Sequence, residues 1–410
     1  MIKVCKIRCY PNKSQVDKIN DVLSGCRYIS NLYIEYEIKR YESTGEFLSG
    51  YDFAKILTKL KKTVPRFSWL KGISTKALKN SILDTEKAFK SFFKKNSGFP
   101  KFKSRKRIKK ESFFFIKDNI KYTDNKNIIK IPILGKIRIT EYDYLPELSS
   151  ITSGRVVKDS DKYYLIFIYE TSSIDLSKNE VGFGIDIGLK SYCTIYNGSK
   201  GYHIKHFKND KKYKQIQRKI QKLQQVLSNK VEVNYYRKLN AYLDKNHEEP
   251  NEHYKNIMKG ESYNTSGVRR IRKKINKLYD KLRNIRKDFI DKLVYKLVAR
   301  AKPAFITIED LSISSMLQND TDHPLHRYIA ESAFYYFRTH ITDKCHEYLT
   351  ELRIARKYFA SSKTCCMCGN KKKHLTLNDR VYRCDVCGNV IDRDENAAFN
   401  LHYTKKYSIA

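Results

Sequence analysis

The sequence lacks the features of a membrane-spanning or secreted protein. No apolar run approaches the roughly 18 residues that a spanning helix needs. The first residues, MIKVCKIRCYPNK, alternate like a strand and contain no apolar signal-peptide core. Internal repeats and low-complexity tracts are also absent. We therefore expect an intracellular protein with several folded domains.

Acidic residues are scarce. The 410 residues include 44 Asp and Glu against 82 Lys and Arg, which gives a formal net charge of +38. So large an excess repels itself unless a polyanion offsets it. Nucleic acid is the polyanion we favour over an anionic membrane, because each neutralised phosphate releases counterions and strengthens binding.

Cysteines are concentrated in one short segment. Five of the ten lie within residues 365–387, which in an intracellular protein indicates a metal site rather than disulfides. Two CxxC pairs have the spacing of zinc knuckles, and each is followed by a glycine that permits a tight turn. Four thiolates close a tetrahedral zinc site, so we expect a structural ion that helps this segment to fold. Cys366 and His374 could compete as ligands, although four thiolates already complete the site. The predicted zinc ligands are Cys365, Cys368, Cys384 and Cys387.

The first half of the chain predicts strands interrupted by helices. Residues 2–10 alternate as a strand, and residues 13–95 have helical periodicity. Residues 98–110, GFPKFKSRKRIKK, read as a basic loop, for which we favour phosphate contact over a merely solvated surface. Residues 113–170 read as strands, including a hairpin that turns at DSD. Together these segments predict a small β-barrel with an inserted helical block. A break in the pattern at 171–180 marks the end of this half of the chain.

Two basic helices are predicted in the second half, joined by the polar segment 244–267. The helices carry apolar residues at the spacing of a coiled-coil seam, so we expect an antiparallel hairpin with lysines and arginines facing outward. The joining segment has no clear pattern and is predicted to be a mobile loop. The seam residues are Ile216, Ile220, Leu223, Leu227, Ile271, Ile275, Leu278, Leu282, Ile285 and Phe289.

The remaining second half alternates between strands and helix. Residues 181–198 read as a strand, a polar turn and a second strand, and 303–312 as a buried strand. Residues 324–351 predict a helix, and 353–362 a further strand that leads to the cysteines. This part is therefore predicted to be an α/β domain.

Three acids stand out against the basic background. Asp186 (GIDIG) and Glu309 (ITIED) interrupt apolar strands, where an unpaired carboxylate is costly. Asp394 (DRDENAAFN) lies at or near the N-cap of a helix, whose Ala397 and Ala398 are small enough to pack on a sheet. Each acid alone has a structural explanation, but three together favour a hard-cation site. Two Mg²⁺ ions about 3.5–4 Å apart would support phosphodiester hydrolysis, so we predict nuclease chemistry.

These motifs resemble those of the TnpB family, RNA-guided nucleases of bacterial insertion sequences that are related to type V CRISPR effectors. The matching second-half segments are GIDIGLKSY, RNIRKDFIDKLVYKL, ITIEDLSISSM, FASSKTCCMCG, RVYRCDVCG and DRDENAAFN. YPNKSQ, KNSILDTEKAFKSFF and PKFKSRK extend the likeness through the first half. The resemblance implies the catalytic triad Asp186, Glu309 and Asp394. Asp394 is preferred to Asp392 because the family's third acid precedes x-Asn-Ala-Ala.

The resemblance also implies the architecture: an RNase H-like RuvC nuclease domain with an inserted zinc ribbon, and an N-terminal wedge β-barrel with an inserted helical recognition domain. The expected ranges are 1–12 and 105–175 for the wedge barrel, 13–104 for the recognition domain, 176–360 and 391–410 for the RuvC domain, and 361–390 for the zinc ribbon.

For partners, the resemblance implies one guide RNA per protein, transcribed from the transposon end and called omega RNA, and double-stranded target DNA. The expected location is the bacterial cytoplasm, with activity at the nucleoid. Lys76 and Asn80 match positions that read a short motif beside the target; they are predicted to be exposed at i,i+4 on one helix, and Asn suits adenine. A merely solvated helix face is an equally good interpretation of this pair.

Four functions are compatible with the family. An RNA-guided DNA endonuclease is the function we favour, because all three acids are present. A repressor that binds DNA without cutting would be marked by loss of a triad acid. A transposase that joins strands itself would need a second nuclease motif or a tyrosine nucleophile signature, and neither is seen. A small CRISPR effector would differ only by a neighbouring repeat array.

Overall fold

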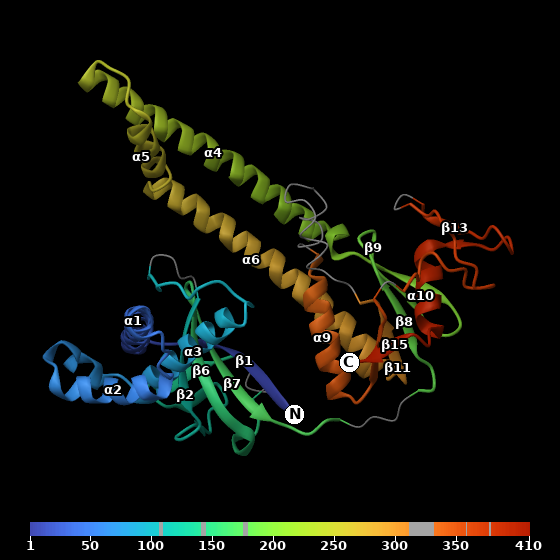
Figure 1. Ribbon diagram of the computed structural model, residues 1–410, viewed down its shortest axis with the longest axis horizontal. Coiled ribbons are helices and arrows are strands. Elements are labelled where there is room, and N and C mark those ends of the chain that lie inside the picture. Colours follow the sequence, from blue (N-terminus) through green and yellow to red (C-terminus); the bar gives the residue numbers. More distant parts are fainter. Residues whose placement is uncertain (106–109, 141–144, 175–178, 311–331, 358, 377–378) are drawn as a thin grey trace. The chain divides into compact units, whose positions relative to one another are not determined.

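The structure is a computed structural model that describes residues 1–105, 110–140, 145–174, 179–310, 332–357, 359–376 and 379–410. The chain forms two compact units, Met1–Ser172 and Ser173–Ala410 (Figure 1). Their boundary lies inside the segment where the sequence predicts a break. Among the described helices, none combines the length and the apolar character needed to cross a bilayer.

A seven-stranded antiparallel sheet forms the base of the first unit. The predicted alternation along the first strand is confirmed, and it places Ile7 and Cys9 in the core. The strand order is β2-β6-β7-β1-β5-β4-β3, so β2 and β3 are edge strands of the described sheet. Closure into a barrel therefore stays a prediction. The strands are β1 (Ile2–Tyr10), β2 (Lys110–Ile116), β3 (Lys121–Tyr122), β4 (Ile128–Ile131), β5 (Gly135–Ile139), β6 (Ile151–Asp159) and β7 (Lys162–Glu170).

The helical block lies in the chain between β1 and β2, as the sequence predicts. Asn12 and Gln15 form a reciprocal capping box at the start of the first helix, which ends at Gly45 in the left-handed region at φ 69°. Ser74 caps the last helix, which buries Leu78 and other apolar residues against the core. The elements are α1 (Lys13–Thr44), α2 (Gly50–Thr63), a 3₁₀ helix (Pro65–Gly72) and α3 (Thr75–Phe93).

A six-stranded mixed sheet forms the centre of the second unit. Its order is β10-β9-β8-β11-β12-β15, in which β8, β11 and β12 are parallel neighbours and the other pairings are antiparallel. This confirms an α/β unit. The strands are β8 (Phe183–Ile187), β9 (Ser191–Tyr196), β10 (Gly201–Lys205), β11 (Phe305–Ile308), β12 (Glu351–Ala355) and β15 (Tyr407–Ile409).

Helices cover both faces of this sheet. On β8, Phe183 and Ile185 join an apolar core that includes residues of α6 (Ser266–Tyr295) and α9 (Phe334–Glu347). Because side chains alternate along a strand, Gly184 and Asp186 face the opposite side. There Gly184 lies directly beneath α10 (Arg393–Tyr403). The candidate acids therefore belong to the face that α10 covers.

The basic helices form the predicted antiparallel hairpin, α4 (Lys211–Asn246) and α6 (Figure 1). Ile216, Ile220, Ile275 and Leu282 are buried along the seam, and the other predicted seam residues are half-buried beside them. A π-helical turn, Lys296–Arg300, follows α6.

The predicted mobile loop between these helices is wrong, because the segment contains the helix α5 (Glu252–Ser262). Asn251 caps α5 by accepting a hydrogen bond from the Tyr254 amide, and Glu252 stands favourably in its first turn. Met258 is buried, and Lys238 of α4 pairs with Glu261 at 2.6 Å. Packing on α4 thus stabilises a helix whose sequence pattern is weak.

Candidate active site and metal centre

Register places the first two acids side by side. The parallel strands β8 and β11 pair with Ile185 opposite Ile308. The residue that follows each of these two is an acid: Asp186, the last but one residue of β8, and Glu309, directly after β11. Like charges at this end of the sheet must repel unless a cation or proton intervenes.

Burial raises the pKa of both Asp186 and Glu309, and charge repulsion from neighbouring acids adds to the rise at Asp186. Burial, followed by the charges of Glu309 and Asp394, raises the pKa of Asp186 well above its usual value. Burial also raises the pKa of Glu309, opposed by a hydrogen bond from the Ser361 hydroxyl and by the Arg393 charge. A pair of carboxylates in this state is what a divalent cation would stabilise.

The third acid is brought in by α10, which approaches β8 very closely. A Cβ on Gly184 would lie 2.1 Å from the carbonyl oxygen of Ala398 and 2.4 Å from the backbone nitrogen of His402. Ala397 and Ala398 are fully buried, as their small size predicts. Only glycine beneath alanines allows this separation, so Gly184 sets the distance between Asp394 and the sheet.

The N-cap of α10 is Asp392, and Asp394 stands two residues further on in the first turn, in agreement with the prediction that it lies at or near the N-cap. The Asp392 carboxylate accepts hydrogen bonds from the amides of Asp394 (2.9 Å) and Glu395 (3.2 Å). Asp394 lies one residue further into the first turn than Arg393, where α10 begins. Because Asp392 is occupied with capping, the Asp394 carboxylate is not needed for it.

Asp186 lies within electrostatic reach of both Glu309 and Asp394, and the donor atoms of all three side chains are oxygens. Oxygen donors suit Mg²⁺. Among the described residues, three or more donor atoms within 4.8 Å of one another are found only in the cysteine cluster, so the acids are more widely spaced than that.

Two further residues, Ser361 and His203, contact acidic side chains in this region and were not predicted from the sequence. The Ser361 hydroxyl donates to Glu309 Oε1. His203 on β10 lies with Nε2 3.2 Å from Glu395 Oε1, and its Nδ1 is 2.8 Å from the Thr194 hydroxyl. Ser361 stands in the FASSKTCCMCG motif, which is the one signal in the sequence that could have drawn attention to it.

The four predicted cysteines form one cluster, with all sulfurs within 4.8 Å of one another. Gly369 and Gly388 adopt φ 74° and 71°, as the tight knuckle turns require. Backbone hydrogen bonds from Cys387 and Val386 lower the pKa of Cys384 to about 6, which favours the thiolate that zinc needs. The cluster fits zinc and forms a ribbon with β13 (Val381–Arg383) and β14 (Val390–Asp392).

The two possible competing ligands stand outside this cluster. Cys366 is half-buried, with Asn389 Nδ2 at 3.4 Å from its sulfur, and His374 is exposed. Four thiolates therefore suffice for a tetrahedral site.

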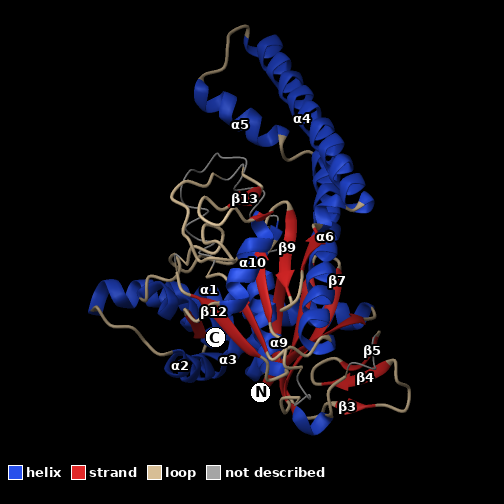
Figure 2. Cartoon of the chain, turned by 90° about the vertical axis from the view of Figure 1, so that its right-hand side faces the viewer, coloured by secondary structure: helices blue, strands red, loops and turns tan. Residues whose placement is uncertain are grey.

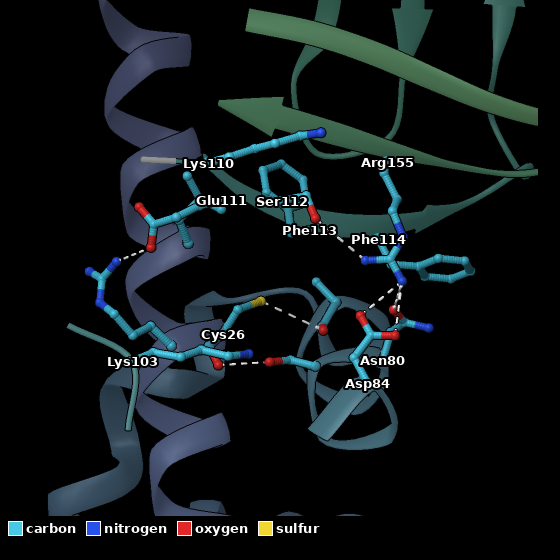
Figure 3. A pocket seen from close by; sticks show the side chains of 14 residues that line it. Cys26, Asn80, Asp84, Lys103, Lys110, Glu111, Ser112, Phe113, Phe114 and Arg155 are labelled. Atoms are coloured by element: carbon cyan, nitrogen blue, oxygen red, sulfur yellow. Dashed lines mark hydrogen bonds and ion pairs between the residues drawn. The ribbon is translucent and has the colours of Figure 1, made fainter. Parts of the chain in front are cut away.

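The candidate DNA-reading residues differ in exposure. Lys76 is exposed on α3, as predicted. Asn80 is half-buried, so its predicted full exposure is wrong: its Oδ1 accepts a hydrogen bond from Arg155 Nη2 at 2.8 Å. Asp84 accepts from the same nitrogen at 2.8 Å (Figure 3). Arg155 thus holds the Asn80 amide with Nδ2 free of partners among the described residues.

Asn80, Asp84 and Arg155 line a cavity of about 330 Å³ between α1, α3, β2 and β6 (Figure 3). Two other charged side chains of its lining, Arg27 and Glu111, pair with each other. The described part of the basic segment, 98–105, is irregular, and Lys103 in it exchanges two backbone hydrogen bonds with the side chain of Asn31. Residues 106–109 lie outside the described residues.

The fold contains both helices and sheets (Figure 2), and its four-cysteine cluster is compatible with a zinc ribbon. Residues 334–401 match the family described as "Cas12f1-like, TNB domain", and residues 167–320 match the family described as "Probable transposase".

Relatives match nearly the whole chain. A "Putative RNA-guided DNA endonuclease" of Streptomyces pristinaespiralis is 26% identical over 397 residues, which cover 97% of this chain and 87% of the relative. The Escherichia coli protein "Putative RNA-guided DNA endonuclease InsQ" is 23% identical over 415 residues, with 98% and 91% covered.

A solved structure entitled "Structure of the mini-RNA-guided endonuclease CRISPR-Cas_phi3" matches the fold with TM-score 0.50 at 10% identity, covering 98% of this chain and 92% of that one. These findings confirm the resemblance of the chain to the TnpB family.

Proposed function

We propose that the protein is a transposon-encoded, RNA-guided DNA endonuclease that cuts double-stranded DNA beside a short target-adjacent motif. The observation that carries the proposal is the convergence of Asp186, Glu309 and Asp394 at one end of the β8–β11 sheet, with a raised pKa at Asp186. The names of the two relatives that match nearly the whole chain support it. The proposed location is the bacterial cytoplasm, at the nucleoid.

The site acts through its carboxylates. When bound, two Mg²⁺ ions would activate a water and stabilise the leaving oxygen of the phosphodiester. Asp186, Glu309 and Asp394 are the residues that would hold the ions. The strand register fixes Asp186 beside Glu309, and the contact of α10 with Gly184 fixes the position of Asp394. The chain thus supplies a preorganised set of oxygen donors, which is its main contribution to this kind of catalysis.

The proposed partners are a guide RNA, one per protein, and the target duplex. The net charge of +38 supports both. Lysines and arginines on the hairpin stand outside its apolar seam, among them the exposed Lys219, Arg269 and Lys273. These positions suit phosphate contact without removing apolar residues from the core.

In the first unit we propose that Lys76 and Asn80 read the target-adjacent motif. The Arg155 hydrogen bond modifies the expected preference for adenine, because it occupies one acceptor position of Asn80 Oδ1. The free Nδ2 can donate to N7 of either purine or to O4 of thymine. The wedge barrel, the recognition domain and the domain ranges given above belong to the same proposal.

A repressor that binds DNA without cutting is the alternative function. It would not require three carboxylates near one end of the sheet, so their placement there favours cleavage. The test is to purify the protein with its RNA, sequence that RNA, and offer a matching duplex with Mg²⁺ or Ca²⁺. We expect cleavage with Mg²⁺ and binding without cleavage with Ca²⁺, whose looser shell positions water poorly. Binding without cleavage under both conditions would establish the repressor.

A further inference from the structure

The segment 361–366 joins the zinc ribbon to the candidate active site. Ser361 is 2% exposed, and its hydroxyl donates to Glu309 Oε1. The carbonyl oxygen of the same residue accepts a hydrogen bond from Asn400 Nδ2 of α10 at 2.8 Å. One buried serine therefore touches an acid that follows β11 and the helix that carries another acid.

Asn396, two residues after Asp394 on α10, strengthens this connection. It is fully buried, and its Nδ2 donates to the Thr364 carbonyl at 2.7 Å. Its Oδ1 accepts from the Cys366 amide, inside the first zinc knuckle, at 2.9 Å. Both the oxygen and the nitrogen of this buried side-chain amide are hydrogen-bonded. They hold α10 strongly against the segment 364–366, because breaking either bond would leave an unpaired polar group in the interior. Hydrogen bonds therefore join the ribbon, α10 and the segment that begins at Ser361.

We propose that Ser361 is a positioning residue that orients the Glu309 carboxylate toward the metal ions and links the zinc ribbon to the nuclease centre. This inference rests on the proposed function. The hydroxyl fixes one oxygen of Glu309 and leaves the other for a metal ion. Residues that orient a metal ligand in this way typically change metal affinity or activity by about 10–100-fold when they are removed.

Ser361→Ala in the purified protein–RNA complex is the direct test. We expect cleavage of a guide-matched duplex to fall about 10–100-fold, and the Mg²⁺ concentration for half-maximal rate to rise. Zinc content and DNA affinity should stay as in the wild type, since neither depends on the Glu309 carboxylate. Ser262→Ala is the matched control: this serine is also fully buried, and its hydroxyl bonds to the Met258 carbonyl on α5, away from the acids.

Metal binding gives a readout that is independent of cleavage. Mn²⁺ bound by the complex is measured by electron paramagnetic resonance, with the Asp186→Ala complex as background for ions held by RNA. Ser361→Ala should weaken this binding in the wild type but not further in a Glu309→Ala background, because two residues that act through one contact are non-additive. A loss in both backgrounds would show general unfolding and overturn the proposal. Ser361→Thr, which keeps the hydroxyl, should recover binding.

The inference and the proposed function fail differently. If Glu309→Ala is inactive while Ser361→Ala cuts and binds Mn²⁺ like the wild type, Ser361 has no positioning role and the nuclease site stands. If Glu309→Ala itself cuts normally, the proposed active site is wrong.

Discussion

Replacing Gly184 by alanine should displace α10 and so disturb the proposed active site. The added Cβ would lie 2.1 Å from the Ala398 carbonyl oxygen, 2.4 Å from the His402 nitrogen and 2.9 Å from the His402 Cα. All three are backbone atoms of α10, so no side-chain rotation relieves the clash. Overpacking of a close-packed core costs about 1–3 kcal/mol and occasionally more, and the helix must move away from β8.

Movement of α10 carries Asp394 away from Asp186. A displacement of about 1 Å can reduce catalysis on the order of 10²-fold. We therefore expect Gly184→Ala to lower single-turnover cleavage about 100-fold, and to lower the free energy of unfolding of the second unit by about 1–3 kcal/mol in urea titration. RNA and DNA binding should be retained, because the exposed lysines and arginines of the hairpin belong to α4 and α6 and not to α10.

Gly260→Ala is the control for this experiment. Gly260 lies within α5 with no atom within 4 Å of an added Cβ. Alanine there should stabilise the helix by about 0.5–1 kcal/mol and leave cleavage unchanged. Wild-type cleavage by Gly184→Ala would refute the claim that the close approach of α10 to β8 sets the site.

Two further predictions test the ribbon and the DNA-reading residues. Cys384→Ser should release zinc and unfold the segment around 360–400 with loss of cleavage, whereas Cys366→Ser should keep zinc. Mass spectrometry of the native protein measures the bound metal. A wild-type preparation that cleaves DNA without zinc would contradict the prediction. Lys76→Ala and Asn80→Ala should each weaken discrimination of the target-adjacent motif by about 1–3 kcal/mol in a library-cleavage assay, and Lys59→Ala, an exposed lysine on α2, should not. Unchanged motif preference would assign the α3 pair to an ordinary solvated helix face.

Much of the fold could be predicted because the hydrophobic periodicity of the segments agrees with the turn and capping residues between them. Residues 2–10 alternate and form β1, and the coiled-coil spacing in α4 and α6 gives their hairpin. The zinc cluster follows from local spacing alone, since CxxC-Gly specifies each knuckle. The helix α5 was missed because its stability comes from packing on α4, which local periodicity does not encode.

The meeting of the acids lies beyond local sequence reasoning. Asp186 adjoins Glu309 only because β8 and β11, far apart in the chain, pair with Ile185 opposite Ile308. The engagement of Asn80 by Arg155 is equally non-local, because it joins α3 to β6. The role of Asp392 as N-cap was ambiguous in a run of acids, where several residues could serve.

The most direct test of the account compares two acids that lie two residues apart. Asp394→Ala should abolish cleavage of a guide-matched duplex while leaving RNA and DNA binding nearly intact, because basic surfaces carry the affinity. Asp392→Asn removes a charge but keeps an oxygen that can cap α10, so it should cut at a rate close to the wild type. An inactive Asp392→Asn beside a fully active Asp394→Ala would contradict the proposed metal centre.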